Sequence, residues 1–74
     1  MPFREESSGT VIRTIQNYGF IRQDSGEPDL FFMNLNVEAF GGVCPPRGTR
    51  VMCRIGTSTW TGLPIAENIV PEVL

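Results

Sequence analysis

The fold of this chain is decided by the stretch N-Y-G-F-I-R-Q-D-S-G-E-P-D-L-F-F-M, residues 17–33. Within it, two runs rich in aromatic and branched apolar residues, 18–23 and 30–33, flank a segment at 24–28 that is built from turn-forming residues. Strand-forming runs separated by such a segment are typical of a β-hairpin. We therefore predict two antiparallel strands joined by a turn.

Alternation assigns the residues of this hairpin to two faces, because successive side chains of a strand point to opposite sides. We expect the apolar core to contain Ile21, Leu30 and Phe32. The outer face then carries the other large side chains of the two runs: Tyr18, Phe20, Arg22, Phe31 and Met33. Three aromatic rings facing solvent are unusual for a small domain and mark this face as a candidate binding surface.

Three further strands are predicted from the remaining pattern. Residues 10–15 are mostly β-branched, residues 51–55 alternate, and a fifth strand is expected roughly over residues 65–70, before Pro71. Between them, residues 34–48 form a long connection with one helical turn near its start. We predict an all-β, five-stranded antiparallel Greek-key barrel over residues 9–74, preceded by a flexible tail at 1–8. The expected core is Val11, Ile21, Leu30, Phe32, Val51 and Ile55.

Composition and charge narrow the possible functions. The chain has 74 residues and a net charge of −2, but residues 9–70 contain five Arg and five acidic residues and are neutral. Two cysteines without any His fit no common zinc motif. Cys44 lies in a Pro-rich loop and Cys53 should point inward from its strand, so we expect both to stay reduced and unbridged. No apolar run approaches membrane-spanning length. These features predict a cytoplasmic domain without a membrane partner.

The hairpin sequence resembles the cold-shock domain family of oligonucleotide-binding folds. N-Y-G-F-I at residues 17–21 is similar to the first ribonucleoprotein motif of that family, usually K-G-F-G-F-I, and D-L-F-F-M at residues 29–33 to the second, usually D-[VIL]-F-[VF]-H. Residues 9–11, 48–55 and 62–69 match the opening, fourth and closing strands in order. The resemblance covers residues 9–70 and is closer to the divergent eukaryotic domains of multi-cold-shock proteins than to bacterial cold-shock proteins.

This resemblance implies a single-stranded nucleic-acid-binding module that prefers RNA. Tyr18, Phe20 and Phe31 match the aromatic residues on which the family stacks bases, and Met33 stands where the motif has His. Single-stranded DNA is a second ligand of the family, and neighbouring RNA-binding domains or other proteins are further expected partners. The residues expected to contact nucleic acid are Arg13, Tyr18, Phe20, Arg22, Phe31 and Met33. The family's strand-one Trp has no counterpart here.

Catalysis is not expected, because the chain has no His, no Lys, no phosphate-binding glycine loop and no nucleophile beside a base. We therefore predict a non-enzyme without cofactor or metal. Asp24, Glu27 and Asp29 are interpreted as solvated turn charges, and Trp60 as a loop residue folded back on the barrel. The alternative function is a protein-interaction or structural barrel that has lost nucleic-acid binding.

Overall fold

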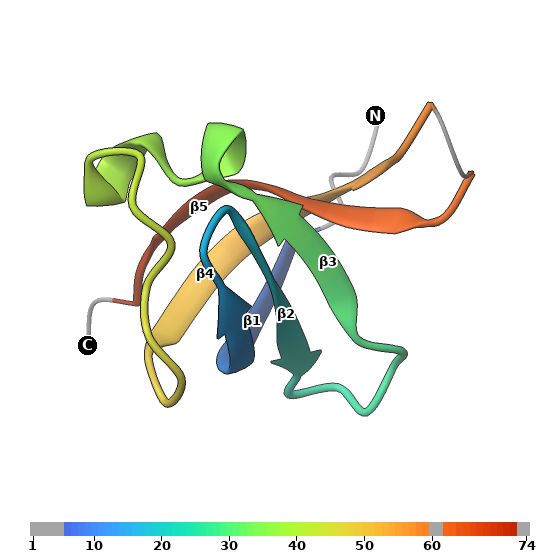
Figure 1. Ribbon diagram of the computed structural model, residues 1–74. Coiled ribbons are helices and arrows are strands. Elements are labelled where there is room, and N and C mark those ends of the chain that lie inside the picture. Colours follow the sequence, from blue (N-terminus) through green and yellow to red (C-terminus); the bar gives the residue numbers. More distant parts are fainter. Residues whose placement is uncertain (1–5, 60–61, 73–74) are drawn as a thin grey trace.

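The computed structural model describes residues 6–59 and 62–72 and contains five strands (Figure 1). The strands are β1 (Glu6–Ile15), β2 (Tyr18–Gln23), β3 (Leu30–Met33), β4 (Arg50–Thr57) and β5 (Pro64–Pro71). Two short 3-10 turns, η1 (Asn34–Asn36) and η2 (Glu38–Phe40), follow β3. The predicted bounds of β2 and β3 are confirmed, and the helical turn expected after β3 is present as η1 and η2. Trp60 lies outside the described residues.

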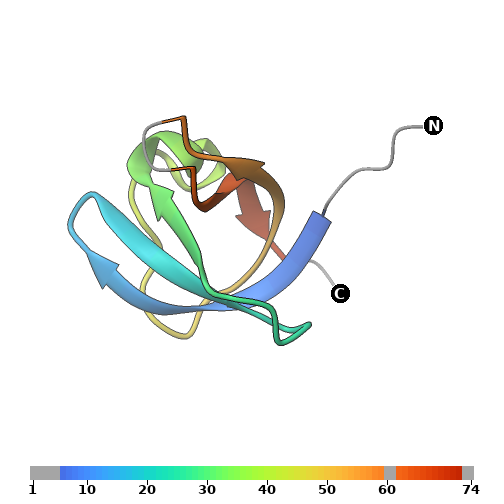
Figure 2. The same cartoon turned by 90° about the vertical axis from the view of Figure 1, so that its right-hand side faces the viewer.

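The five strands close into a barrel with the order β1-β2-β3-β5-β4, and β4 pairs back onto β1. Figure 2 shows the strands curving around one interior. The predicted all-β barrel is therefore confirmed. Neighbouring strands of the barrel pair antiparallel, except for β3 and β5, which pair in parallel at Phe31 and Ile65. An odd number of strands cannot alternate in direction all the way around a ring, so a closed five-stranded barrel requires a parallel pair.

The core fills the barrel with the residues that alternation assigned to it. Val11, Ile21, Leu30, Phe32 and Val51 are all fully buried, as predicted. The prediction was wrong for Ile55, which is only half-buried and packs against the edge of the core, in the last part of β4 before the loop to β5. The core cluster also contains Cys53, whose alternation in β4 predicts an inward side chain, and four residues that the sequence did not place there, Val37, Cys44, Ala66 and Ile69.

The barrel wall begins earlier than expected. Residues 6–8 were predicted to belong to a flexible tail, but they are part of β1 and pair with residues 52–54 of β4. The buried side chain of Gln23 supports this segment, because the Ser7 hydroxyl donates a 2.7 Å hydrogen bond to Gln23 Oε1. Gln23 Nε2 donates in turn to the Pro28 carbonyl at 2.7 Å. Polar residues 6–8 thus close the barrel through backbone pairing rather than through apolar side chains.

Both cysteines are free and buried. Burial raises the pKa of the Cys53 thiol to about 11 and also raises the pKa of Cys44. Because the thiolate is the reactive form, both groups are poor nucleophiles at neutral pH. Cys53 therefore acts as a small apolar core residue of β4.

Candidate nucleic-acid interface

One row of side chains crosses the outer face of the barrel from β1 to β5. The strand registers pair Arg13 with Phe20, Phe20 with Phe31, and Phe31 with Ile65. Paired residues of neighbouring strands point to the same side of a sheet. The row therefore places a guanidinium group, two aromatic rings and an aliphatic side chain next to each other on four adjacent strands.

Tyr18, Phe20 and Phe31 form a cluster that we call the aromatic platform. Their ring centroids lie 6.2 Å apart for Tyr18 and Phe20, 5.7 Å for Tyr18 and Phe31, and 5.7 Å for Phe20 and Phe31. Tyr18 is 37% exposed, and the two Phe side chains are half-buried against their neighbours. The rings pack edge-to-face or tilted against one another, at interplanar angles of 82°, 37° and 64°, and keep part of their surfaces open to solvent.

A β-bulge places Arg13 beside this platform. The register of β1 and β2 pairs Val11 with Ile21 but Arg13 with Phe20, so one residue of β1 is inserted between these pairs. Val11 consequently points into the core, and Arg13 points to the outer face rather than to the interior. A bulge re-aims a side chain in this way at many binding sites. Thr14 then faces Gly19, and its hydroxyl donates a 2.6 Å hydrogen bond to the Pro45 carbonyl.

Met33 extends the platform at the end of β3. It pairs with Tyr18 and is 39% exposed. The backbone N–H of Met33 donates a 2.9 Å hydrogen bond to the Asn36 side chain, which fixes the turn into η1. This turn leaves Leu35 80% exposed directly after the strand.

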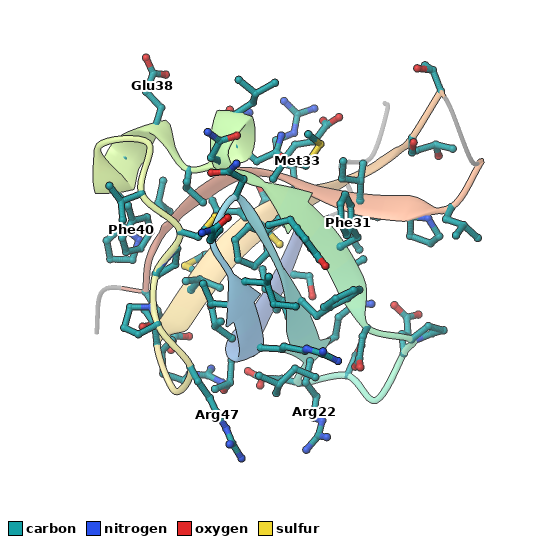
Figure 3. All side chains as sticks on the ribbon, in the orientation of Figure 1. Arg22, Phe31, Met33, Glu38, Phe40 and Arg47 are labelled. Carbon is teal, nitrogen blue, oxygen red and sulfur yellow. The ribbon has the colours of Figure 1, made fainter. Side chains whose placement is uncertain are left out.

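Arg22 lies at the other end of the face. It pairs with Thr10 and is exposed near the turn that follows β2. In Figure 3 its side chain points in the same direction as Arg47, away from Phe31 and Met33. Among the described residues, Arg13, Arg22 and Arg47 form no ion pair. Five of the six predicted contact residues are therefore brought together, and Arg22 borders them at one end.

A groove adjoins the platform and was not predicted from the sequence. It has a volume of about 610 Å³ and is lined by Phe31, Met33, Leu35, Ile65, Glu67 and residues 57–59. The groove is mostly apolar, and it arises where β3 meets β5 beside the loop between β4 and β5. Figure 1 shows this β4–β5 hairpin extending beyond β3. The exposed Leu35 between two Asn residues was the only local signal in the sequence.

Arg50 forms hydrogen bonds and ion pairs at one end of the barrel, away from the platform. Its guanidinium group donates to both carboxylate oxygens of Asp24 at 2.7 and 2.6 Å, to Glu72 at 2.9 Å and to the Thr10 hydroxyl at 3.0 Å. The Arg50 hydrogen bonds lower the pKa of Asp24 below its usual value. Asp24 is therefore not an unpaired solvated charge, as the turn composition had suggested. It remains exposed, but it ties the turn after β2 to β4.

No helix among the described residues is long and apolar enough to cross a membrane, and no group of three or more His, Cys, Asp or Glu side chains in that part of the chain is placed to hold a metal ion. No protein-family model matches the chain, and no curated protein sequence matches it. Function is therefore inferred from the geometry of the platform and the groove.

Proposed function

We propose that this chain is a cold-shock-type domain that binds single-stranded RNA by stacking bases on the aromatic platform. The observation that carries the proposal is the contact of three partly exposed rings, 5.7–6.2 Å apart, on the outer face of one hairpin. A monomeric domain gains little stability from aromatic surface left open to water. A planar base recovers that surface at about 1–3 kcal/mol per stacked ring.

The surroundings of the platform favour a single strand over a duplex. Bases in a duplex are already stacked on each other, whereas the bases of a single strand can lie flat on aromatic side chains. Arg13, at one end of the row, supplies a guanidinium group for a phosphate or a base. The platform then holds the bases, and the backbone of the strand faces solvent, which is compatible with the zero net charge of residues 9–70.

The test uses two adjacent residues of β3 that face opposite sides. Phe31 is half-buried on the platform, and Phe32 is fully buried in the core. We expect Phe31→Ala to weaken binding of a short single-stranded RNA by about 1–3 kcal/mol while the barrel stays folded. We expect Phe32→Ala to destabilise the fold by about 3–5 kcal/mol. Fluorescence titration and thermal unfolding measure the two effects.

Two results would count against the proposal. RNA affinity that is unchanged in Phe31→Ala would mean that the rings do not stack bases. Unfolding of Phe31→Ala to the extent of Phe32→Ala would mean that the platform is part of the core. If the parent protein binds neither RNA nor DNA, the second candidate applies, a protein-binding barrel. The apolar groove and the exposed Leu35 at its rim favour that candidate.

A further inference from the structure

Glu67 is the only acidic residue among those that line the groove in the described part of the chain. It follows Ile65 by two positions on β5, so both side chains lie on the outer face while Ala66 between them is buried. Ile65 is the partner of Phe31 in the row across the barrel. A carboxylate is therefore built into the groove directly beside the aromatic platform.

Gly56 provides the space for this carboxylate. A Cβ atom at Gly56 would lie 2.5 Å from Glu67 Oε2 and 2.6 Å from Glu67 Cδ, so the carboxylate lies against the backbone of β4. In the β4–β5 ladder Gly56 pairs with Ile65, and Arg54 pairs with Glu67. These two register pairs are neighbours on the outer face of the sheet. Any side chain at position 56 would displace the carboxylate from its present position.

The carboxylate oxygens are available to a ligand. Within residues 6–59 and 62–72, Glu67 forms neither a side-chain hydrogen bond nor an ion pair, and Arg54, its partner in the β4–β5 register, forms no ion pair with it. A carboxylate accepts hydrogen bonds and donates none, and its two oxygens can accept from two neighbouring donors at once. The groove therefore offers a pair of acceptors at the side of an apolar wall formed by Phe31, Ile65 and Leu35.

We propose that the groove receives a guanine base and that Glu67 recognises its Watson–Crick edge, an inference that rests on the proposed single-strand binding. Guanine presents two adjacent donors on that edge, N1–H and the N2 amino group, which match the two carboxylate oxygens. Adenine and cytosine present one amino group beside a ring acceptor, and the single N3–H of uracil lies between two carbonyl oxygens that repel a carboxylate. The groove volume of about 610 Å³ lies within the range of small-molecule pockets, roughly 300–1,000 Å³.

The experiment compares the affinity of three RNA oligomers of about six bases, the site size of such folds. One is all uridine, the second carries one guanosine scanned through the positions, and the third carries inosine at the best position. We expect the parent protein to prefer the best guanosine oligomer over oligouridine about tenfold, as for a bidentate contact to a base. Inosine lacks the N2 amino group, so the affinity for the inosine oligomer should lie between the affinities for the guanosine oligomer and oligouridine.

Three variants separate recognition by the carboxylate from the effect of charge alone. In Glu67→Gln the ratio of the affinities for the guanosine oligomer and oligouridine should fall toward one, because an amide offers one acceptor oxygen instead of two. Gly56→Ala keeps the charge but moves the carboxylate, so it should reduce the preference as well. Glu38→Gln is the matched control, since Glu38 lies on η2 and outside the groove lining (Figure 3). It should keep the preference of the parent.

The possible results separate the two proposals. Equal affinity of the parent for the guanosine and uridine oligomers would overturn the recognition by Glu67 and leave stacking intact. A guanosine preference that persists in Glu67→Gln would also overturn the proposed recognition of guanine by Glu67. If no oligomer binds the parent protein, the proposed function itself fails.

Discussion

Gly19 shows at the scale of a residue why the tyrosine and phenylalanine of β2 are separated by a glycine. It is buried, and its partner across the β2–β3 pair is Phe32. A Cβ atom at this position would lie 2.5 Å from the Arg13 carbonyl oxygen and 2.7 Å from Cζ of the Phe32 ring. The largest core side chain therefore fills the space that a side chain at position 19 would need. Gly19 lets β2 pack tightly against the core while Tyr18 and Phe20, its neighbours in the sequence, both point to the outer face.

Gly19→Ala should consequently destabilise the barrel. A Cβ atom would press on a backbone oxygen and on a ring that has no free space to move into, and overpacking of this kind costs about 1–3 kcal/mol. Gly56→Ala is the matched control, because the three atoms nearest to its Cβ atom all belong to the flexible end of Glu67. Thermal unfolding of both variants measures the difference. Equal melting temperatures would show that the interior around Phe32 is not tightly packed.

At the scale of the elements, Arg50 joins segments that are distant in the sequence. It begins β4 and contacts Thr10 on β1, Asp24 after β2 and Glu72 after β5. Both ion pairs are exposed to solvent, so each one alone contributes little to stability. Their combined effect is to fix one end of the barrel, where the turn after β2 meets the ends of β4 and β5.

This network predicts a specific loss of stability in acid. The pKa of Asp24 is lowered in the folded protein, so its interaction with Arg50 is complete above the usual value of 3.8 and is lost as the pH falls through the lower folded value. The melting temperature of the parent should therefore fall more steeply below about pH 4 than that of Asp24→Asn. Scanning calorimetry between pH 2 and pH 6 (roughly the acid window in which carboxylates titrate) measures both slopes. Parallel curves for the two proteins would exclude the contribution of Asp24.

The elements that the sequence predicts well are those with a local pattern. Alternation in residues 18–23 and 30–33 is sufficient to define β2, β3 and the two faces of their hairpin. Residues 6–8 carry no such pattern, because their place in β1 depends on pairing with β4 more than 40 residues away. The groove depends likewise on the parallel contact of Phe31 with Ile65. Pairings of this kind are set by barrel closure and leave no periodic signal in either segment.

At the scale of the whole molecule, the distribution of charge predicts how binding responds to salt. Arg50 is engaged by two carboxylates. Of the other described arginines, Arg13 and Arg22 border the platform, whereas Arg54 lies on β4 beside Glu67 and Arg47 lies in the loop before β4. Each phosphate neutralised by a protein cation contributes about 0.7 to the logarithmic salt slope for a single strand. We expect a slope below about two on that scale. Titrations at several salt concentrations measure it, and a steeper slope would require a basic surface elsewhere on the protein.

The most direct measurement is an amide chemical-shift titration of the isotope-labelled protein with a single-stranded RNA of about six to eight bases, the site size of such folds. If the platform binds bases, the largest shifts should follow the row of Phe20, Phe31 and Ile65 and include Met33. The amide of Met52, on the outer face of β4 on the far side of the barrel, should not move. Shifts centred on β4, or no shifts at low salt, would contradict binding at the platform.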